Sequence, residues 1–424
     1  MILTRTLCSL ALTTLVAAPA FSQGVWSTPV NVSTAQPDNF SSSVAIDPAG
    51  NASVAFLGLV QRTSAVTNAY ASTLPAGGAW SAATMISTSG RAEAPTLKVD
   101  TFGNVSAAWT SFLDTQLATR PAGNAWLPAE TVAPGVMSAQ FLVNANGDQA
   151  LVWTTSLPGL DVSVMRKPAG GVWGPQQIVV QGNAQTIFVQ AGRASLADNG
   201  DLVVPFEYYR LYCTTTCINI NWVMRTARQP AAGGPWQISG NQAGPDNGSH
   251  YPQSAVDPSG ATTVVYRKAY TLYAIGQAGA GQPWTPPATI YSGVKTGTFG
   301  TGISGTGQAT VFVVDSGNVM AMDGTAATNQ WLPPVVVSGT DGSATRMVFA
   351  VAPTGAAVVS WNGPTNVRAA VRSGVWGAPQ SVSPALPGVM PESVSINSAG
   401  QAVLGYRRWL TSWSRAVYCV TYQP

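Results

Sequence analysis

The stretch VAIDPAGNASVAF, residues Val44–Phe56, alternates apolar and polar side chains on both sides of an Asp-Pro-Ala-Gly turn. Alternation with a period of two predicts two strands, each buried on one face. In the turn, the Asp47 side chain can cap the backbone and Pro48 fixes its own φ. Gly50 can adopt the left-handed conformation that closes a type I turn with a bulge. The stretch therefore predicts an antiparallel β-hairpin.

Seven further stretches match this hairpin when the chain is aligned on the turn glycine. They are LKVDTFGNVSAAW (Leu97–Trp109), FLVNANGDQALVW (Phe141–Trp153), ASLADNGDLVVPF (Ala194–Phe206), SAVDPSGATTVVY (Ser254–Tyr266), GISGTGQATVFVV (Gly302–Val314), FAVAPTGAAVVSW (Phe349–Trp361) and VSINSAGQAVLGY (Val394–Tyr406). A period near 50 residues, built from strand-length elements, is typical of propellers. Asn, Ser and Ala replace Asp47 in other repeats, so we interpret this carboxylate as a turn residue and not as a catalytic one.

A tryptophan marks a further strand in each repeat, and a third strand precedes it, as in DVSVMRKPAGGVW (Asp161–Trp173). These tryptophans are Trp26, Trp80, Trp126, Trp173, Trp236, Trp284, Trp331 and Trp376. Each repeat then contains four strands, and we expect the tryptophans to pack between neighbouring sheets.

The phase of the repeats predicts how the array closes. Trp26 precedes the first hairpin, whereas the last hairpin is followed only by SRAVYCVTYQP (Ser414–Pro424). GVWSTPVNVS (Gly24–Ser33) should therefore complete the last sheet, which removes exposed sheet edges. We predict an all-β, eight-bladed β-propeller of four-stranded antiparallel blades, with the last blade closed by the N-terminal strand. Seven blades is the alternative if Gly302–Val314 forms no sheet.

Composition and the N-terminal residues restrict the class of protein and the compartment in which we expect it. The 424 residues are 46% hydrophobic and 9% charged, with a formal net charge of +3. These values argue against a disordered chain and against binding to nucleic acid. Residues 1–20 have the pattern of a secretory signal peptide, with Arg5, an apolar run and a small-residue cleavage site. We expect residues 21–424 to form a single β-propeller domain, secreted or periplasmic and without a membrane span.

Cysteine usage fits an exported protein. Cys213 and Cys217 flank three threonines, and we predict a disulfide between them. The alternative, a metal-binding pair, lacks a second pair or nearby histidines. Cys419 is expected to be a buried strand residue. We predict no metal site and no cofactor.

The order of the strands in each blade determines on which of the two faces of the propeller each connection lies. The turns that contain Gly50 and its equivalents, and the turns before the tryptophans, share one face, which we call the regular face. The second-to-third loops and the connections between blades share the other, which we call the irregular face. Three segments stand out there: FEYYRLYCTTTCININ (Phe206–Asn221), YRKAY (Tyr266–Tyr270) and YRRWLTSW (Tyr406–Trp413).

These segments and the connections between blades supply the ligand-binding candidates. They are Glu93, Glu207, Tyr208, Tyr209, Arg210, His250, Arg267, Lys268, Arg346, Glu392, Arg407, Arg408 and Trp409, with Arg91, Asp246 and Trp413 nearby. Aromatic side chains beside arginines suit sugar rings and carboxylates, through stacking and bidentate hydrogen bonds. The alternative interpretation is that these are solvated loop residues without a ligand.

The repeats resemble those of bacterial exported β-propeller repeat proteins, with a D-x-x-G-N-A…W hairpin followed by turns such as RPAGNAW (Arg120–Trp126) and KPAGGVW (Lys167–Trp173). Such repeats are loosely grouped with the sialidase-like and BNR-like propellers. The sialidase Asp-box has one residue between Asp and Gly, whereas Asp47 and Gly50 are separated by two. No arginine triad or Tyr–Glu nucleophile pair can be carried over, so the resemblance implies a fold and not a chemistry.

Catalytic patterns are sparse. His250 is the only histidine, and no G-x-S-x-G motif is present. Paired-carboxylate chemistry through Glu93, Glu207, Asp246 or Glu392 stays open, because their separation cannot be derived from sequence. We predict a non-enzymatic propeller that binds an extracellular glycan or protein on the irregular face. The alternatives are a sialidase-like carbohydrate-active enzyme with a glycoside hydrolase-like activity, and a structural surface or assembly module. Ligand identity and oligomeric state are not specified by the sequence.

Overall fold

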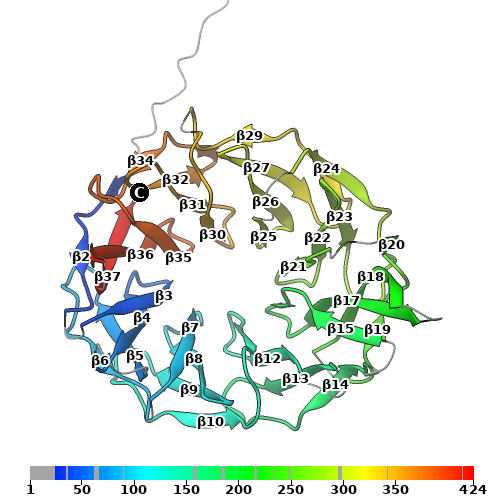
Figure 1. Ribbon diagram of the computed structural model, residues 1–424, viewed down its shortest axis with the longest axis horizontal. Coiled ribbons are helices and arrows are strands. Elements are labelled where there is room, and N and C mark those ends of the chain that lie inside the picture. Colours follow the sequence, from blue (N-terminus) through cyan, green and yellow to red (C-terminus); the bar gives the residue numbers. More distant parts are fainter. Residues whose placement is uncertain are drawn as a thin grey trace, which may run out of the picture.

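The computed structural model describes residues 24–34, 37–61, 66–88, 90–155, 160–182, 187–213, 217–231, 233–246, 248, 250–294, 298–340, 342–412 and 414–424. The predicted signal peptide lies outside these residues. Within them, all regular elements are β-strands, and they form eight antiparallel sheets. The sheets are arranged as blades around a central axis (Figure 1). The eight-bladed propeller is therefore confirmed.

Each blade runs outward from an innermost strand. Blade 1 contains β3 (Asn39–Ile46), β4 (Ala52–Leu59), β5 (Thr67–Leu74) and β6 (Thr84–Met85). Blade 2 contains β7 (Ala92–Val99), β8 (Val105–Ser111), β9 (Asp114–Arg120) and β10 (Glu130–Ala133). Blade 3 contains β11 (Gln140–Val143), β12 (Gln149–Thr154), β13 (Val162–Lys167) and β14 (Gln177–Val180). Blade 4 contains β15 (Ile187–Ala191), β16 (Ser195–Leu196), β17 (Leu202–Cys213), β18 (Cys217–Gln229), β19 (Gln237–Ile238) and β20 (Ala243–Asp246).

The second half repeats this plan. Blade 5 contains β21 (Gln253–Val256), β22 (Thr262–Lys268), β23 (Thr271–Gln277) and β24 (Ala288–Ser292). Blade 6 contains β25 (Phe299–Ile303), β26 (Gln308–Asp315), β27 (Asn318–Thr325), β28 (Gln330–Trp331) and β29 (Val335–Val336). Blade 7 contains β30 (Met347–Val351), β31 (Ala357–Asn362), β32 (Val367–Ser373), β33 (Val375–Trp376) and β34 (Gln380–Ser381). Blade 8 contains β35 (Met390–Ile396), β36 (Ala402–Thr411) and β37 (Ser414–Gln423).

Two short N-terminal strands complete blade 8, as the repeat phase predicts. β1 (Val25–Trp26) and β2 (Val30–Asn31) both pair with β37, with Trp26 opposite Tyr422. The first and last strands accordingly lie side by side in the ring (Figure 1). Since β25 and β26 also form a regular pair, the seven-bladed alternative is wrong.

The turn chemistry follows the sequence interpretation. All eight turn glycines have left-handed φ, from 78° at Gly307 to 92° at Gly260. In blade 5 the Asp257 carboxylate accepts hydrogen bonds from the backbone N–H groups of Ser259 (2.9 Å) and Ala261 (2.8 Å). The repeated carboxylate therefore stabilises the turn and is committed to its backbone.

The hydrophobic core lies between the blades. Second strands contribute large, fully buried rings, including Phe56, Trp109, Phe206, Trp361 and Tyr406. The tryptophans near the fourth strands pack against the same clusters, as expected; Trp126, Trp173 and Trp376 are examples. Cys419 is buried here too, and burial raises the pKa of its thiol.

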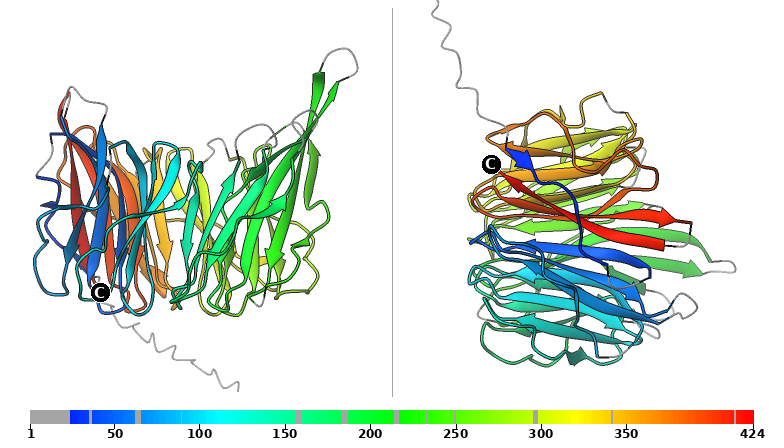
Figure 2. Two further views of the ribbon diagram at one scale, coloured as in Figure 1. Left: turned by 90° about the horizontal axis from the view of Figure 1, so that it is seen from below. Right: turned by 90° about the vertical axis from the view of Figure 1, so that its left-hand side faces the viewer.

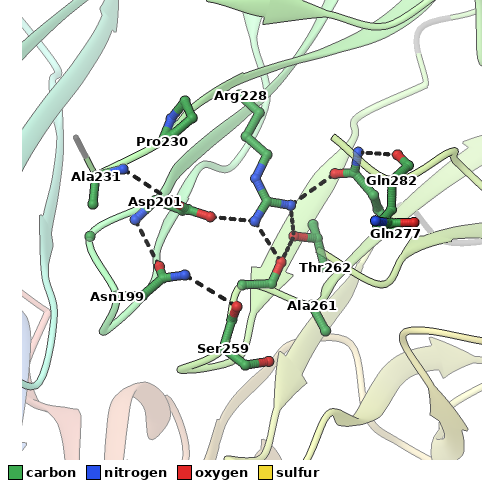
Figure 3. Close-up of polar contacts among 12 residues, drawn as sticks. Asn199, Asp201, Arg228, Pro230, Ala231, Ser259, Ala261, Thr262, Gln277 and Gln282 are labelled. Carbon is green, nitrogen blue, oxygen red and sulfur yellow. Dashed lines mark hydrogen bonds and ion pairs between the residues drawn. The ribbon is translucent and has the colours of Figure 1, made fainter. Parts of the chain in front are cut away.

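Buried arginines near the regular face join neighbouring blades (Figure 3). The Arg228 guanidinium of blade 4 forms an ion pair with Asp201 and donates to the carbonyl oxygen of Gly260 (2.8 Å) and to Gln277 Oε1 (2.9 Å) of blade 5. Both charged side chains are almost fully buried. The network therefore fixes blade 4 against blade 5 and leaves these charges no role in binding.

The three segments predicted as loops on the irregular face are mostly strand. Phe206–Cys213 and Cys217–Asn221 belong to β17 and β18, which stand out from the disc as a two-stranded ribbon (Figure 2). Tyr266–Lys268 belong to β22, and Tyr406–Thr411 to β36. The prediction of loops was wrong because cross-strand pairing continues beyond the packed part of the blade. Cys213 and Cys217 are opposite each other in the ribbon, but their side chains, and so the predicted disulfide, lie outside the described residues.

Candidate functional site

A cavity of about 710 Å³ lies at the centre of the ring. Residues of all eight blades line it, among them Ser43, Thr96, Gln140, Arg193, Gln253, Phe299, Phe349 and Ser393. Figure 1 shows the innermost strands surrounding this axis. We call this cavity the central channel. It is formed by residues that are remote in sequence and that only ring closure brings together.

Two cations line the central channel. Lys98 lies on β7 of blade 2, and Arg193 lies between β15 and β16 of blade 4. The backbone of Arg193 is fixed, since its N–H donates to Pro252 O and its carbonyl accepts from Ser254 N–H, both at 2.9 Å. Its guanidinium reaches the ring of Phe349 in blade 7, with 5.7 Å between Cζ and the ring centroid. Arg193 therefore spans part of the channel.

Phe349 has room because blade 6 carries a glycine at the facing position. A Cβ on Gly300 would overlap the Phe349 ring, and this ring stacks on Phe312 at 4.8 Å between centroids. Gly300 lies in β25, the innermost strand of blade 6.

The pKa values of both cations are lowered, although Arg193 is exposed to the channel and Lys98 is half-buried. Desolvation, with a smaller contribution from the charge of Arg193, lowers the pKa of Lys98 from 10.5 to about 8. Desolvation also lowers the pKa of Arg193. A shift in this direction is what burial without an acidic partner produces.

Two predicted acidic candidates also line the channel, and both are hydrogen-bonded. Glu392 accepts hydrogen bonds from the N–H (2.6 Å) and Oγ (2.7 Å) of Ser42, and Arg407 Nε lies 3.6 Å from it. Glu207 accepts from the backbone N–H of His250 at 2.7 Å. Glu392 belongs to blade 8 and Glu207 to blade 4, so they lie on opposite sides of the ring. They do not form the closely spaced pair that glycoside hydrolysis uses.

Three exposed aromatic rings on the irregular face each contact an arginine. Tyr251, 52% exposed, also lines the channel, and Arg267 Cζ lies 5.2 Å from its ring centroid. Trp409 is 40% exposed, with Arg415 Cζ at 5.1 Å from its ring centroid. The third pair, Phe112 and Arg91, lies on blade 2. We call these three pairs the rim pairs.

The remaining candidates are dispersed. His250 is fully buried with its ring edge against Tyr266, so it does not face a ligand. Tyr208 lies under Arg225 and donates to Asn241, and Arg408 lies over Tyr418. Glu93, Lys268 and Arg346 are exposed on different blades. The side chains of Tyr209, Arg210 and Asp246, and all of Trp413, lie outside the described residues.

Sequence reasoning missed Lys98, Arg193, Tyr251, Phe112 and Arg415. A signal was present for the first two, because a charged residue in a predicted innermost strand is unusual in a chain with so few charges.

Among the residues that the structure describes, no group of three or more His, Cys, Asp or Glu side chains is arranged to hold a metal ion. In the same residues, no helix is long and apolar enough to cross a membrane.

Comparisons with known proteins support the architecture. No protein-family model matches the chain, and no curated protein matches it in sequence. Among solved structures, the polysaccharide lyase Uly1 is similar with a TM-score of 0.52 at 7% identity, over 92% of this chain and 90% of that one. The Dos1 propeller is similar with a TM-score of 0.51 at 8% identity, over 93% and 94% of the two chains. The NanB sialidase of Streptococcus pneumoniae matches with a TM-score of 0.38 at 11% identity, over 92% and 69%. At these identities the likeness to the first two structures shows a shared fold only.

Proposed function

We propose that this protein is a secreted or periplasmic β-propeller that binds a glycan on its irregular face without catalysing a reaction on it. The observation that carries the proposal is the set of rim pairs. An exposed aromatic ring offers a flat apolar face on which a sugar ring can stack, and the guanidinium groups of Arg91 and Arg267 can donate hydrogen bonds to hydroxyl or carboxylate oxygens. The Arg415 guanidinium is held by the carboxylate of Asp38, so it supports the Trp409 ring. The rim pairs lie on blades 2, 5 and 8, which suits an extended ligand.

The arrangement of acids favours binding over catalysis. Each of the carboxylates of Glu207 and Glu392 accepts hydrogen bonds from backbone or hydroxyl groups, and the two lie on opposite sides of the ring. Glycoside hydrolysis uses two carboxyl groups about 5–10 Å apart on either side of one bond, and Glu207 and Glu392 do not form such a pair. The similarity to the polysaccharide lyase Uly1 is compatible with a carbohydrate ligand for this fold.

The proposal can be tested by glycan-array screening followed by calorimetry. The variants Tyr251→Ala and Trp409→Ala remove a stacking surface and should each weaken binding about tenfold, because base and sugar stacking on an aromatic ring contributes on the order of 1–3 kcal/mol. Phe102→Ala is the matched control, since Phe102 is an aromatic residue with 68% exposure in a regular-face turn. Absence of binding to any glycan, or equal losses in Phe102→Ala and the rim variants, would contradict the proposal.

A further inference from the structure

Lys98 and Arg193 lack acidic partners. In the part of the chain that the structure describes, neither the Lys98 ammonium nor the Arg193 guanidinium has a hydrogen bond or an ion pair, and the guanidinium lies over the Phe349 ring. This differs from the buried arginines between the blades, where Arg228 pairs with Asp201 and Arg372 with Asp323. Two like charges that line one cavity without a counter-charge repel each other, which is unfavourable for the fold.

The acids of the channel do not supply the missing charge. Glu392 is bound to Ser42 and lies close to Arg407, and Glu207 is bound to the backbone of His250. The pKa shifts agree, since only burial and mutual repulsion act on Lys98, and only burial acts on Arg193. The cations are therefore available to an anion that enters the channel.

The position of the two cations suits a group that enters from the irregular face. Arg193 lies seven residues before its turn glycine and Lys98 five, so Lys98 is about 7 Å nearer the regular face along the strand direction. Tyr251, which is exposed on the irregular face, lines the same cavity. A volume of about 710 Å³ is in the range of sites for small ligands.

We propose that the central channel binds an oxyanionic group of the ligand, a carboxylate or a sulfate ester, between Lys98 and Arg193. This inference rests on the proposed function and restricts the ligand to an acidic glycan. The rim pairs hold the sugar rings, and the channel selects for the charged substituent. Arg193 can donate two parallel hydrogen bonds to such a group, and Lys98 supplies a second positive charge.

Calorimetry at pH 6.5 and low chloride tests the inference with four probes: an alginate hexasaccharide, a carrageenan hexasaccharide, maltohexaose and sodium sulfate. The first two distinguish carboxylate from sulfate ester, maltohexaose is neutral, and sulfate is a free oxyanion. Lys98→Met and Arg193→Met should each weaken binding of at least one acidic hexasaccharide about tenfold or more, because each removes a charge-assisted contact. Binding of maltohexaose should not change. Lys98→Arg, which keeps the charge, should retain most of the affinity.

Lys167→Met is the matched control, because Lys167 lies at the end of β13 and outside the channel. Suppose that Lys98→Met and Arg193→Met bind acidic hexasaccharides with the affinity of the wild type, whereas Tyr251→Ala binds them more weakly. That result would overturn this inference and leave the proposed function standing. Equal losses for neutral and acidic hexasaccharides would also overturn it. If no hexasaccharide binds but sulfate binds and is lost in Lys98→Met, the proposed function fails and the anion site stands.

Discussion

Replacing Lys98 by methionine should stabilise the folded protein at neutral pH. Methionine keeps the length of the side chain and removes a charge that the channel desolvates and Arg193 repels. The pKa of Lys98 falls from 10.5 to about 8 in the fold. A shift of this size corresponds to a cost of about 3 kcal/mol for the charged form relative to the unfolded chain. Water in the channel reduces this, so we expect a gain of about 1–3 kcal/mol.

The gain should depend on pH in a defined direction. Below pH 8 Lys98 is protonated in both states, and the wild type carries the full cost. Between pH 8 and 10.5 the unfolded state holds more protons than the native state, so the wild type gains stability as pH rises. The difference from Lys98→Met should therefore shrink over this window and vanish above it. The other charged groups that line the channel, Arg193, Glu207 and Glu392, are present in both proteins and cancel in the comparison.

Thermal unfolding by calorimetry from pH 6 to pH 10.5 in chloride buffers measures this difference. For a chain of this length, 1 kcal/mol corresponds to roughly 1 °C, so Lys98→Met should unfold about 1–3 °C higher than the wild type at pH 6.5. Lys167→Met should show no such pH-dependent difference. A Lys98→Met protein that is less stable than the wild type at pH 6.5, or a difference that is the same at pH 6.5 and 10.5, would refute the reasoning.

Three further predictions follow from the channel and the blade contacts. Binding of sulfate should weaken as pH rises through about 8, because Lys98 loses its proton there; equal affinities at pH 7 and 9.5 by calorimetry would contradict this. Gly300→Ala should lower the free energy of unfolding by about 1–3 kcal/mol, because its Cβ would overlap the Phe349 ring. Gly279→Ala is the control and should have little effect on the thermal unfolding midpoint, because no atom lies near the added Cβ. Arg228→Met should destabilise the folded protein by about 3–5 kcal/mol, because it leaves Asp201 buried without its partner. Arg346→Met, which changes an exposed arginine, is the control. An unfolding midpoint of Arg228→Met that is no lower than that of the control would argue against the prediction.

The sequence predicts the fold well because the fold depends on local chemistry. Each turn needs a glycine with left-handed φ, and most have a side chain that caps the backbone. These residues recur along the sequence at a spacing near 50 residues. The phase of Trp26 relative to the last hairpin is sufficient to predict how blade 8 is completed. The channel is different, because Lys98, Arg193 and Phe349 become neighbours only through the curvature of the ring. Their contacts depend on the number of blades and on Gly300 in blade 6. Neither can be derived from the residues next to Lys98, Arg193 or Phe349 in the sequence.

The irregular face was predicted less accurately for a related reason. Segments such as Tyr406–Trp413 follow the second strand of a hairpin, and the strand order predicts loops there. In the fold, β36 and β37 continue to pair past the packed core, and polar or aromatic side chains are accommodated on the exposed ribbon. The predicted loop conformation of these segments is wrong, and a role in binding for their residues stays a prediction.

The pairing of β1 and β2 with β37 has a consequence for how the molecule folds. Trp26 and Tyr422 are opposite each other, although nearly the whole chain separates them. Contacts of such long range form late, because the entropy of closing the intervening loop must be lost first. An open repeat array can fold and fray one unit at a time, whereas closure links the first and last repeats into one cooperative unit. The blade that is joined from both ends should therefore be the last to form, and the channel should not exist as a binding site until it has.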